Sequence, residues 1–254
     1  MRTKKHFTKS NYQKSQERKS DLLQMSADSA HLYHGTNETS VMKILREGLH
    51  PRMERVGNWE DFPSNPKCVY LTNCYAPYFA LSAMMTNGGR MGIVEIRTTD
   101  EMLNNCVPDE DYLEHSTRNG HPYTTEETIE RTKLCQSKML EMKGEWEESL
   151  SGLGNLCHLG PIDSKYIRRV ALLDGEQWRW LLWYSMGLDF RVAVSQHSKN
   201  LPKQRALTRW IFGEHVSYRE ILGDHRPSNV ERRLLSERRG IEIITNTQDL
   251  LEAA

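Results

Sequence analysis

The chain has 254 residues, of which 37% are hydrophobic and 27% are charged, and its 34 Lys and Arg are balanced by 34 Asp and Glu. This composition is typical of a folded globular protein and excludes a chain that is disordered over most of its length. No run of 18 apolar residues is present, and no apolar stretch follows the basic start. We therefore expect neither a membrane span nor a signal peptide, and a cytoplasmic location.

Charge is segregated along the chain although the total is zero. Residues 1–19 carry seven Lys and Arg against one Glu, residues 100–148 carry thirteen Asp and Glu against five Lys and Arg, and residues 165–240 carry fifteen Lys and Arg against eight acids. Basic regions of this kind can bind a phosphate backbone, although solvated surface charge gives the same pattern.

The hydrophobic periodicity along the chain predicts a mixture of strands and helices, and thus an α+β fold. Residues 1–28 are rich in Lys, Ser and Gln and are predicted to form a flexible basic arm. A compact domain is predicted over residues 29–175. It begins with a strand at 31–34 and a helix at about 38–47, for which Gly48 is the expected stop.

Further elements follow the same patterns. A strand is predicted for "CVYLT" at 68–72, a helix for 76–86 with Pro77 in its first turn, and a strand for "MGIVEI" after a Gly-Gly turn. The acidic stretch 100–148 is predicted to form a helical insertion on the rim of the domain, with Thr125 as a helix N-cap. "SGLGNLC" is interpreted as a turn and "RRVALLD" as a strand. The basic, Trp-rich region 176–254 is predicted to be mainly helical, with a last strand at "GIEIIT".

Several common sites are unsupported by the motifs present. The sequence has no GxxxxGK[ST], HExxH or GxSxG, and "SGLGNLC" lacks the third glycine of a dinucleotide fold. Five scattered cysteines favour reduced thiols. His31, His34, Cys68 and Cys74 could be combined as metal ligands, but their spacing matches no zinc finger, so we expect no metal.

Three motifs in order are more informative: "LYHGT", then "ILREGL", then "VYLT" followed by a helix. This order resembles the ADP-ribosyltransferase superfamily over about residues 30–175. The resemblance implies a split, bent β-sheet and NAD as the co-substrate. RNA 2'-phosphotransferases share the fold and the opening motif, and Arg46, Arg52 and Arg55 lie where an extra phosphate is held. That family usually places a basic cluster before its second motif, whereas this chain has only Lys67 there. The tyrosine of "VYLT" instead favours chemistry on NAD.

The resemblance assigns roles to individual residues around the NAD. His34 is expected to hydrogen-bond a ribose hydroxyl, and the backbone of Gly35 to approach the carboxamide of nicotinamide. Tyr70 is expected to stack on the cationic pyridinium. The remaining expected contacts to NAD come from Thr36, Arg52 and a second aromatic on the following helix, where Tyr75, Tyr78 and Phe79 are available and Tyr78 is the choice. Each of these residues also has a purely structural alternative. His34 could be a structural histidine, Tyr70 a core residue, and Gly35 a turn glycine.

The third element of the superfamily is an acidic residue close to a later strand, and here the sequence departs from the pattern. Glu148 is the nearest candidate for the catalytic carboxylate, with Glu147 and Glu145 beside it. If these acids lie on a solvated helix, the carboxylate is elsewhere or absent. A non-catalytic module that binds NAD or ADP-ribose is then the alternative.

The acceptor of ADP-ribose is predicted from the periphery of the domain. Cations alternate with Trp178, Trp180, Trp183, Trp210 and Phe212, and exposed aromatics among cations suit stacking on unpaired bases, whereas tryptophans at helical spacing can also form a core. RNA or single-stranded DNA is the predicted acceptor, with a protein or small molecule as alternatives. The resemblance also suggests a toxin or phage-defence effector, with an antitoxin or inhibitor protein as partner.

Overall fold

The computed structural model describes residues 31–52, 64–117, 124–174, 176, 178, 197–223, 226 and 228–245. The predicted arm at 1–28 lies outside them. The strands are β1 (Leu32–Asn37), β2 (Cys68–Thr72), β3 (Met91–Ile96), β4 (Cys106–Pro108), β5 (Asn155–Leu159), β6 (Ile167–Leu173) and β7 (Ile241–Thr245). The α-helices are α2 (Glu38–Glu47), α3 (Ala76–Asn87), α4 (Asp100–Leu103), α5 (Glu110–Thr117), α6 (Thr125–Lys138), α7 (Trp146–Gly152), α10 (His197–Ile211), α11 (Tyr218–Leu222) and α12 (Asn229–Glu237). Short 3-10 turns lie at Lys143–Glu145 and Ser164–Tyr166.

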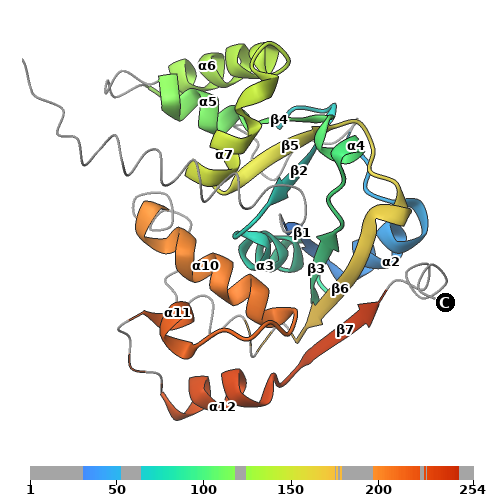
Figure 1. The fold of residues 1–254 in the computed structure, drawn as a ribbon, viewed down its shortest axis with the longest axis vertical. Helices are drawn as coiled ribbons and strands as arrows, with labels where there is room; N and C mark the ends of the chain where they lie inside the picture. Colours follow the sequence, from blue (N-terminus) through green and yellow to red (C-terminus); the bar gives the residue numbers. More distant parts are fainter. Residues whose placement is uncertain are drawn as a thin grey trace, which may run out of the picture.

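All seven strands form one antiparallel sheet in the order β4-β5-β2-β1-β3-β6-β7, so the α+β class is confirmed (Figure 1). The first strand lies at the centre, paired with β3 over six residues. Its pairing with β2 is limited to Tyr33 opposite Thr72. Beyond that pair β1 and β2 have no further register partners, and the sheet opens between them.

Helices cover both faces of the sheet. On one face, side chains of β1, β3 and β6 pack with α3 and α10 to α12, and the β2, β4 and β5 side chains pack with α5 and α6. Val41 and Ile44 of α2 pack on the opposite face with Val69 and Leu71 of β2. No helix in the described part of the chain is long and apolar enough to cross a membrane.

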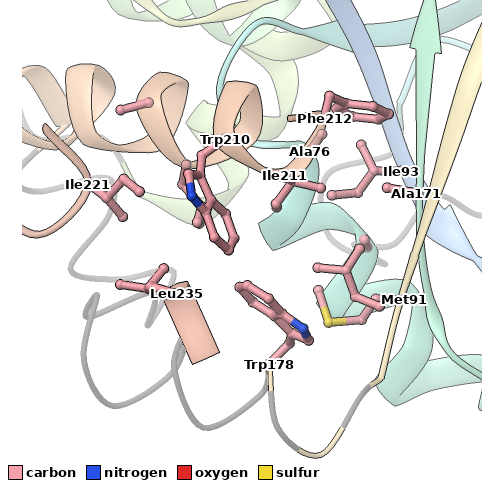
Figure 2. Close-up of a cluster of buried hydrophobic side chains, with 14 of the residues drawn as sticks. Ala76, Met91, Ile93, Ala171, Trp178, Trp210, Ile211, Phe212, Ile221 and Leu235 are labelled. Carbon is pink, nitrogen blue, oxygen red and sulfur yellow. The ribbon is translucent and has the colours of Figure 1, made fainter. Parts of the chain in front are cut away.

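The aromatic residues of the C-terminal region belong to the core rather than the surface. Trp178 is 0% exposed, Trp210 is 7% exposed and Phe212 is 4% exposed. Figure 2 shows the two indoles turned toward one another between α10 and the sheet, with ring centroids 5.8 Å apart. The prediction that these three residues could stack on unpaired bases is therefore wrong, because helix packing buries them. Trp180 and Trp183 lie outside the described residues.

Two stretches that the sequence analysis assigned differently are strands. Asn155–Leu159, interpreted as part of a turn, is β5 and pairs with all of β2. The acidic stretch 100–148 is not wholly helical, because Cys106–Pro108 forms β4 at the sheet edge and pairs with β5. The N-cap of α6 is Thr124, one residue before the predicted Thr125, and it forms a capping box with Glu127.

The C-terminal region shares the sheet and the core with the segment before it. Strand β7 pairs with β6 over five residues, and Leu207 and Ile211 of α10 are buried in the same cluster as Tyr33 and Ala80. The boundary predicted at residue 175 thus separates segments that are packed together.

A buried carboxylate, Glu95, lies in the middle of the sheet. It is 0% exposed and lies opposite Arg169 in the β3–β6 pair. Arg169 donates Nε to Oε2 at 2.5 Å and Nη2 to Oε1 at 3.0 Å, and Nδ1 of His31 lies 3.0 Å from Oε1. Burial raises the pKa of Glu95, but the hydrogen bonds from His31 and Arg169 outweigh burial and lower it from 4.5 to about 2.

This lowered pKa predicts a loss of stability in acid. A carboxyl whose pKa falls on folding stabilises the native state above its unfolded pKa, and the contribution disappears as the pH falls from about 4.5 to about 2. The contribution is about 3 kcal/mol, at about 1.4 kcal/mol per pKa unit. Urea unfolding from pH 7 to pH 2 should show the wild type losing its advantage over Glu95→Gln in that window. The exposed control Glu47→Gln should follow the wild type at every pH. A constant gap between wild type and Glu95→Gln contradicts the prediction.

Candidate functional site

A cavity of about 200 Å³ opens at the place where β1 and β2 separate. It is lined by residues of β1 and β2, by Phe79 of α3, by the corner between β4 and α5, by Thr132 of α6 and by Asn155 of β5. The segments at 50–52 and 64–65 complete it. Four of the residues predicted to contact NAD line this cavity together: His34, Gly35, Arg52 and Tyr70.

The imidazole of His34 bridges the gap between the two strands. Its Nδ1 lies 3.0 Å from the carbonyl oxygen of Tyr70, and because a carbonyl only accepts, Nδ1 carries the proton. Burial lowers the pKa of His34 and outweighs the opposing effect of this hydrogen bond, and the positive charge of Arg52 adds a smaller lowering. His34 is thus neutral at pH 7, and Nε2 has a lone pair that can accept from a hydroxyl.

Tyr70 is held by two hydrogen bonds at its hydroxyl. The hydroxyl donates to Oε1 of Glu110 and accepts from the backbone N–H of Asn65 at 2.6 Å. Burial and the nearby negative charge of Glu110 raise the pKa of Tyr70 far above its usual value, so the phenol keeps its proton. The ring is therefore fixed as a neutral aromatic wall of the cavity.

Glu110 is the acidic side chain that the sequence analysis missed. It is 4% exposed, lines the cavity, and its Oε1 also accepts from Nε2 of Gln136 at 3.2 Å. Strand β4 ends at Pro108 and α5 starts at Glu110. The sharp corner between these two elements places the Glu110 carboxylate against the hydroxyl of Tyr70. The signal in the sequence was "CVPDED", in which a Cys-Val pair and a proline are followed at once by three acids.

The two neighbours of Glu110 also line the cavity. Asp109 is 4% exposed, and its carboxylate accepts from the backbone N–H of Asp111 at 2.8 Å. Burial, together with the charges of Asp111 and Glu110, raises the pKa of Asp109 well above its usual value. With Arg52 also on its wall, the cavity presents a cation and a cluster of acids to one ligand.

Glu148 is not among the residues that line the cavity. It lies in the first turn of α7, where it is exposed and accepts from the hydroxyl of Tyr112 at 3.2 Å. The same helix buries Ser149, whose hydroxyl donates to the carbonyl of Asn155 at 2.8 Å. The buried face of α7 therefore supports β5, while its acids face the solvent.

Two more predicted contacts are placed away from the cavity lining. Thr36 is 3% exposed in β1, and Tyr78 packs against the buried cluster of α3 and α10. The aromatic residue that α3 contributes to the cavity is the next one, Phe79, which lies edge-on to Tyr78 with centroids 5.6 Å apart. Helix rotation of about 100° per residue turns Phe79, rather than Tyr78, toward the cavity.

Gly35 is needed for the approach of α3 to the sheet. A Cβ added there lies 2.2 Å from the carbonyl oxygen of Ala76 and 2.7 Å from both the Ala80 nitrogen and the Phe79 Cβ. Only glycine allows the helix backbone to lie this close to β1. The glycine therefore positions Phe79 over the cavity, a role that the sequence analysis did not assign to it.

No group of three or more His, Cys, Asp and Glu among the described residues is arranged to hold a metal ion. All five cysteines are free and buried. Two acids of the cavity, Asp109 and Glu110, accept hydrogen bonds from protein groups.

Comparisons with known proteins leave the chain without an assigned family. No family model and no curated protein matches it. Eight chains of solved structures match, among them EcPltA, at 13% identity and a TM-score of 0.34, over 57% of this chain and 75% of that one. A likeness at this level supports no conclusion about activity.

Proposed function

We propose that the protein transfers ADP-ribose from NAD to a macromolecular acceptor. The observation that carries the proposal is the meeting of His34, Tyr70 and Glu110 around one cavity, at the opening between β1 and β2. These three side chains come from three separate stretches of the sequence. Together they offer a neutral hydrogen-bond acceptor, an aromatic wall and a carboxylate.

The charges of the cavity complement those of NAD. Arg52 is suited to the diphosphate because a guanidinium binds phosphate oxygens with paired hydrogen bonds. Tyr70 and Phe79 offer aromatic rings to the cationic nicotinamide, a contact worth about 0.5–2 kcal/mol. The Nε2 lone pair of His34 can accept from a ribose hydroxyl.

Glu110 takes the role that the sequence analysis gave to Glu148. In the proposed reaction the bond between the ribose carbon and the nicotinamide nitrogen breaks, and its electron pair leaves with nicotinamide. The transition state gains positive charge on the ribose, which a carboxylate at this position stabilises. A lone pair of the acceptor then bonds to the same carbon, and the proton that the acceptor loses passes to Glu110.

The acceptor that we propose is nucleic acid, as RNA or single-stranded DNA. Support comes from cations of the C-terminal region, where six arginines among the described residues are exposed: Arg209, Arg219, Arg226, Arg232, Arg233 and Arg239. Arginine side chains bind the phosphate backbone without regard to sequence. Trp178 and Trp210 are buried and therefore cannot stack on bases. This part of the proposal thus rests on contacts between arginines and phosphates.

One experiment tests both the transfer and the acceptor. The protein is incubated with NAD that is labelled in its ADP-ribose part and with a cell lysate, and free nicotinamide is measured by mass spectrometry. Parallel samples are treated with RNase, DNase or protease before gel analysis. We expect nicotinamide release and a labelled band that disappears with one of the nucleases.

The other outcomes separate the alternatives. Label that survives both nucleases and disappears with protease indicates a protein acceptor and overturns the nucleic-acid assignment alone. NAD binding without release of nicotinamide, with or without the lysate, indicates a non-catalytic module and overturns the transfer activity.

A further inference from the structure

The start of β5 brings a polar side chain to the closed end of the opening between β1 and β2. Asn155 lies opposite Thr72 of β2, and Thr72 lies opposite Tyr33 of β1. These three residues therefore share one face of the sheet. Tyr70, two residues before Thr72, points to that same face, and Asn155 lines the cavity with it.

The side-chain amide oxygen of Asn155 lacks a hydrogen-bond donor. Its Oδ1 is buried and has no hydrogen-bond partner among the described residues. A buried amide oxygen without a donor costs about 1–3 kcal/mol. Native structures retain few such atoms, and one that lies on a cavity wall is open to a donor that a ligand brings.

The hydroxyl of Thr72, the residue directly opposite Asn155, does not supply that donor. The hydroxyl of Thr72 donates to the carbonyl of Gly154 at 2.7 Å. It also accepts from the backbone N–H groups of Cys74 at 3.1 Å and Tyr75 at 2.9 Å. With its only proton committed, Thr72 leaves Asn155 free for the ligand.

The backbone of Asn155 is held in place independently of the ligand. Its carbonyl accepts from the hydroxyl of Ser149, which in turn accepts from the backbone N–H of Asp109 at 3.0 Å. The strand start is thus tied to α7 and to the acidic corner of the cavity. Its side chain is presented from a rigid element, as a residue that sets specificity requires.

We propose that Asn155 determines specificity for the carboxamide of the nicotinamide ring, by accepting a hydrogen bond from the carboxamide N–H. This inference rests on the proposed function. A ring that stacks between Tyr70 and Phe79 carries its carboxamide at its edge, and an amide N–H is the donor that Oδ1 lacks. A site built to accept a hydrogen bond rejects an analogue without the donor, because its own polar atom is then left unpaired.

The test compares NAD with 3-acetylpyridine adenine dinucleotide, in which a methyl group replaces the amino group of the carboxamide. Release of the free pyridine is measured as kcat/KM for the wild type and Asn155→Leu, with circular dichroism and thermal melting to check folding. We expect the wild type to prefer NAD about 10- to 100-fold, which corresponds to one hydrogen bond of about 1–3 kcal/mol. Asn155→Leu should lose that preference by becoming slower on NAD, with the analogue changed less than about twofold.

Asn87→Leu provides the matched control. Asn87 is exposed at the end of α3 and donates to the carbonyl of Ala83, so the preference for NAD should stay at the wild-type value. A wild type without preference between the two dinucleotides overturns the inference, whether or not the variant folds. So does a variant that slows on both equally. A wild type that releases no nicotinamide from NAD overturns the proposed function and the inference with it, so the two failures are distinct.

Discussion

Replacing Glu110 by Gln is expected to slow the release of nicotinamide from NAD by about 10²- to 10³-fold. The substitution keeps the size of the side chain, and its carbonyl oxygen can still accept from Tyr70 and Gln136. The fold should therefore be retained. What disappears is the negative charge, which the positively charged transition state requires. The measurement is kcat/KM for nicotinamide release, with the thermal melt as a check on folding.

Glu148→Gln is the matched control for Glu110→Gln. It makes the same chemical change in an exposed residue of α7 that the structure places outside the cavity lining. We expect kcat/KM to stay within about twofold of the wild type, since surface changes of this kind have small effects. If Glu148→Gln instead loses activity and Glu110→Gln keeps it, the assignment of the carboxylate to Glu110 is wrong.

Gly35→Ala is expected to destabilise the protein by about 3 kcal/mol or more. The added methyl group lies 2.2 Å from a backbone oxygen and 2.7 Å from a backbone nitrogen of α3, and backbone atoms cannot move aside as a flexible side chain can. Relief requires α3 to move away from β1, which opens the core around Tyr33 and Ala80. Overpacking of this severity exceeds the usual cost of about 1–3 kcal/mol. Urea unfolding measures the difference.

Gly144→Ala makes the same change at a position with open space, where no atom lies within 4 Å of the added Cβ. Its free energy of unfolding should stay within about 0.5 kcal/mol of the wild type. A Gly35→Ala variant as stable as this control contradicts the close packing of α3 on β1.

The sequence predicted elements best where one local pattern determined them. The helix at 38–47 was predicted with its stop at Gly48, and the structure has α2 over Glu38–Glu47 with Asn37 as its cap. The strand "CVYLT" and the helix after it were also predicted close to their observed ends. Their periodicity, caps and glycines act within a few residues, so these features are visible without knowledge of the rest of the chain.

Short strands were missed because their signal lies in their partners. The β5 segment "NLCHL" has little periodicity of its own and becomes a strand by pairing with β2. The three residues of β4 are held in turn by β5. Since β-pairing is a long-range interaction, propensity over three to five residues cannot decide it.

From the sequence alone we predicted that three short stretches meet at one site: the strand with His34 and Gly35, the strand with Tyr70, and Arg52 between them. All four line the cavity. Only the tertiary structure showed that Glu110 lines the cavity with them, because Glu110 is 40 residues from Tyr70 and reaches it through the β4–α5 corner. It likewise decided between Phe79 and Tyr78, and between a buried and an exposed Trp210. Those choices depend on which side of each helix meets the sheet, and that is set by packing against residues far away in the chain.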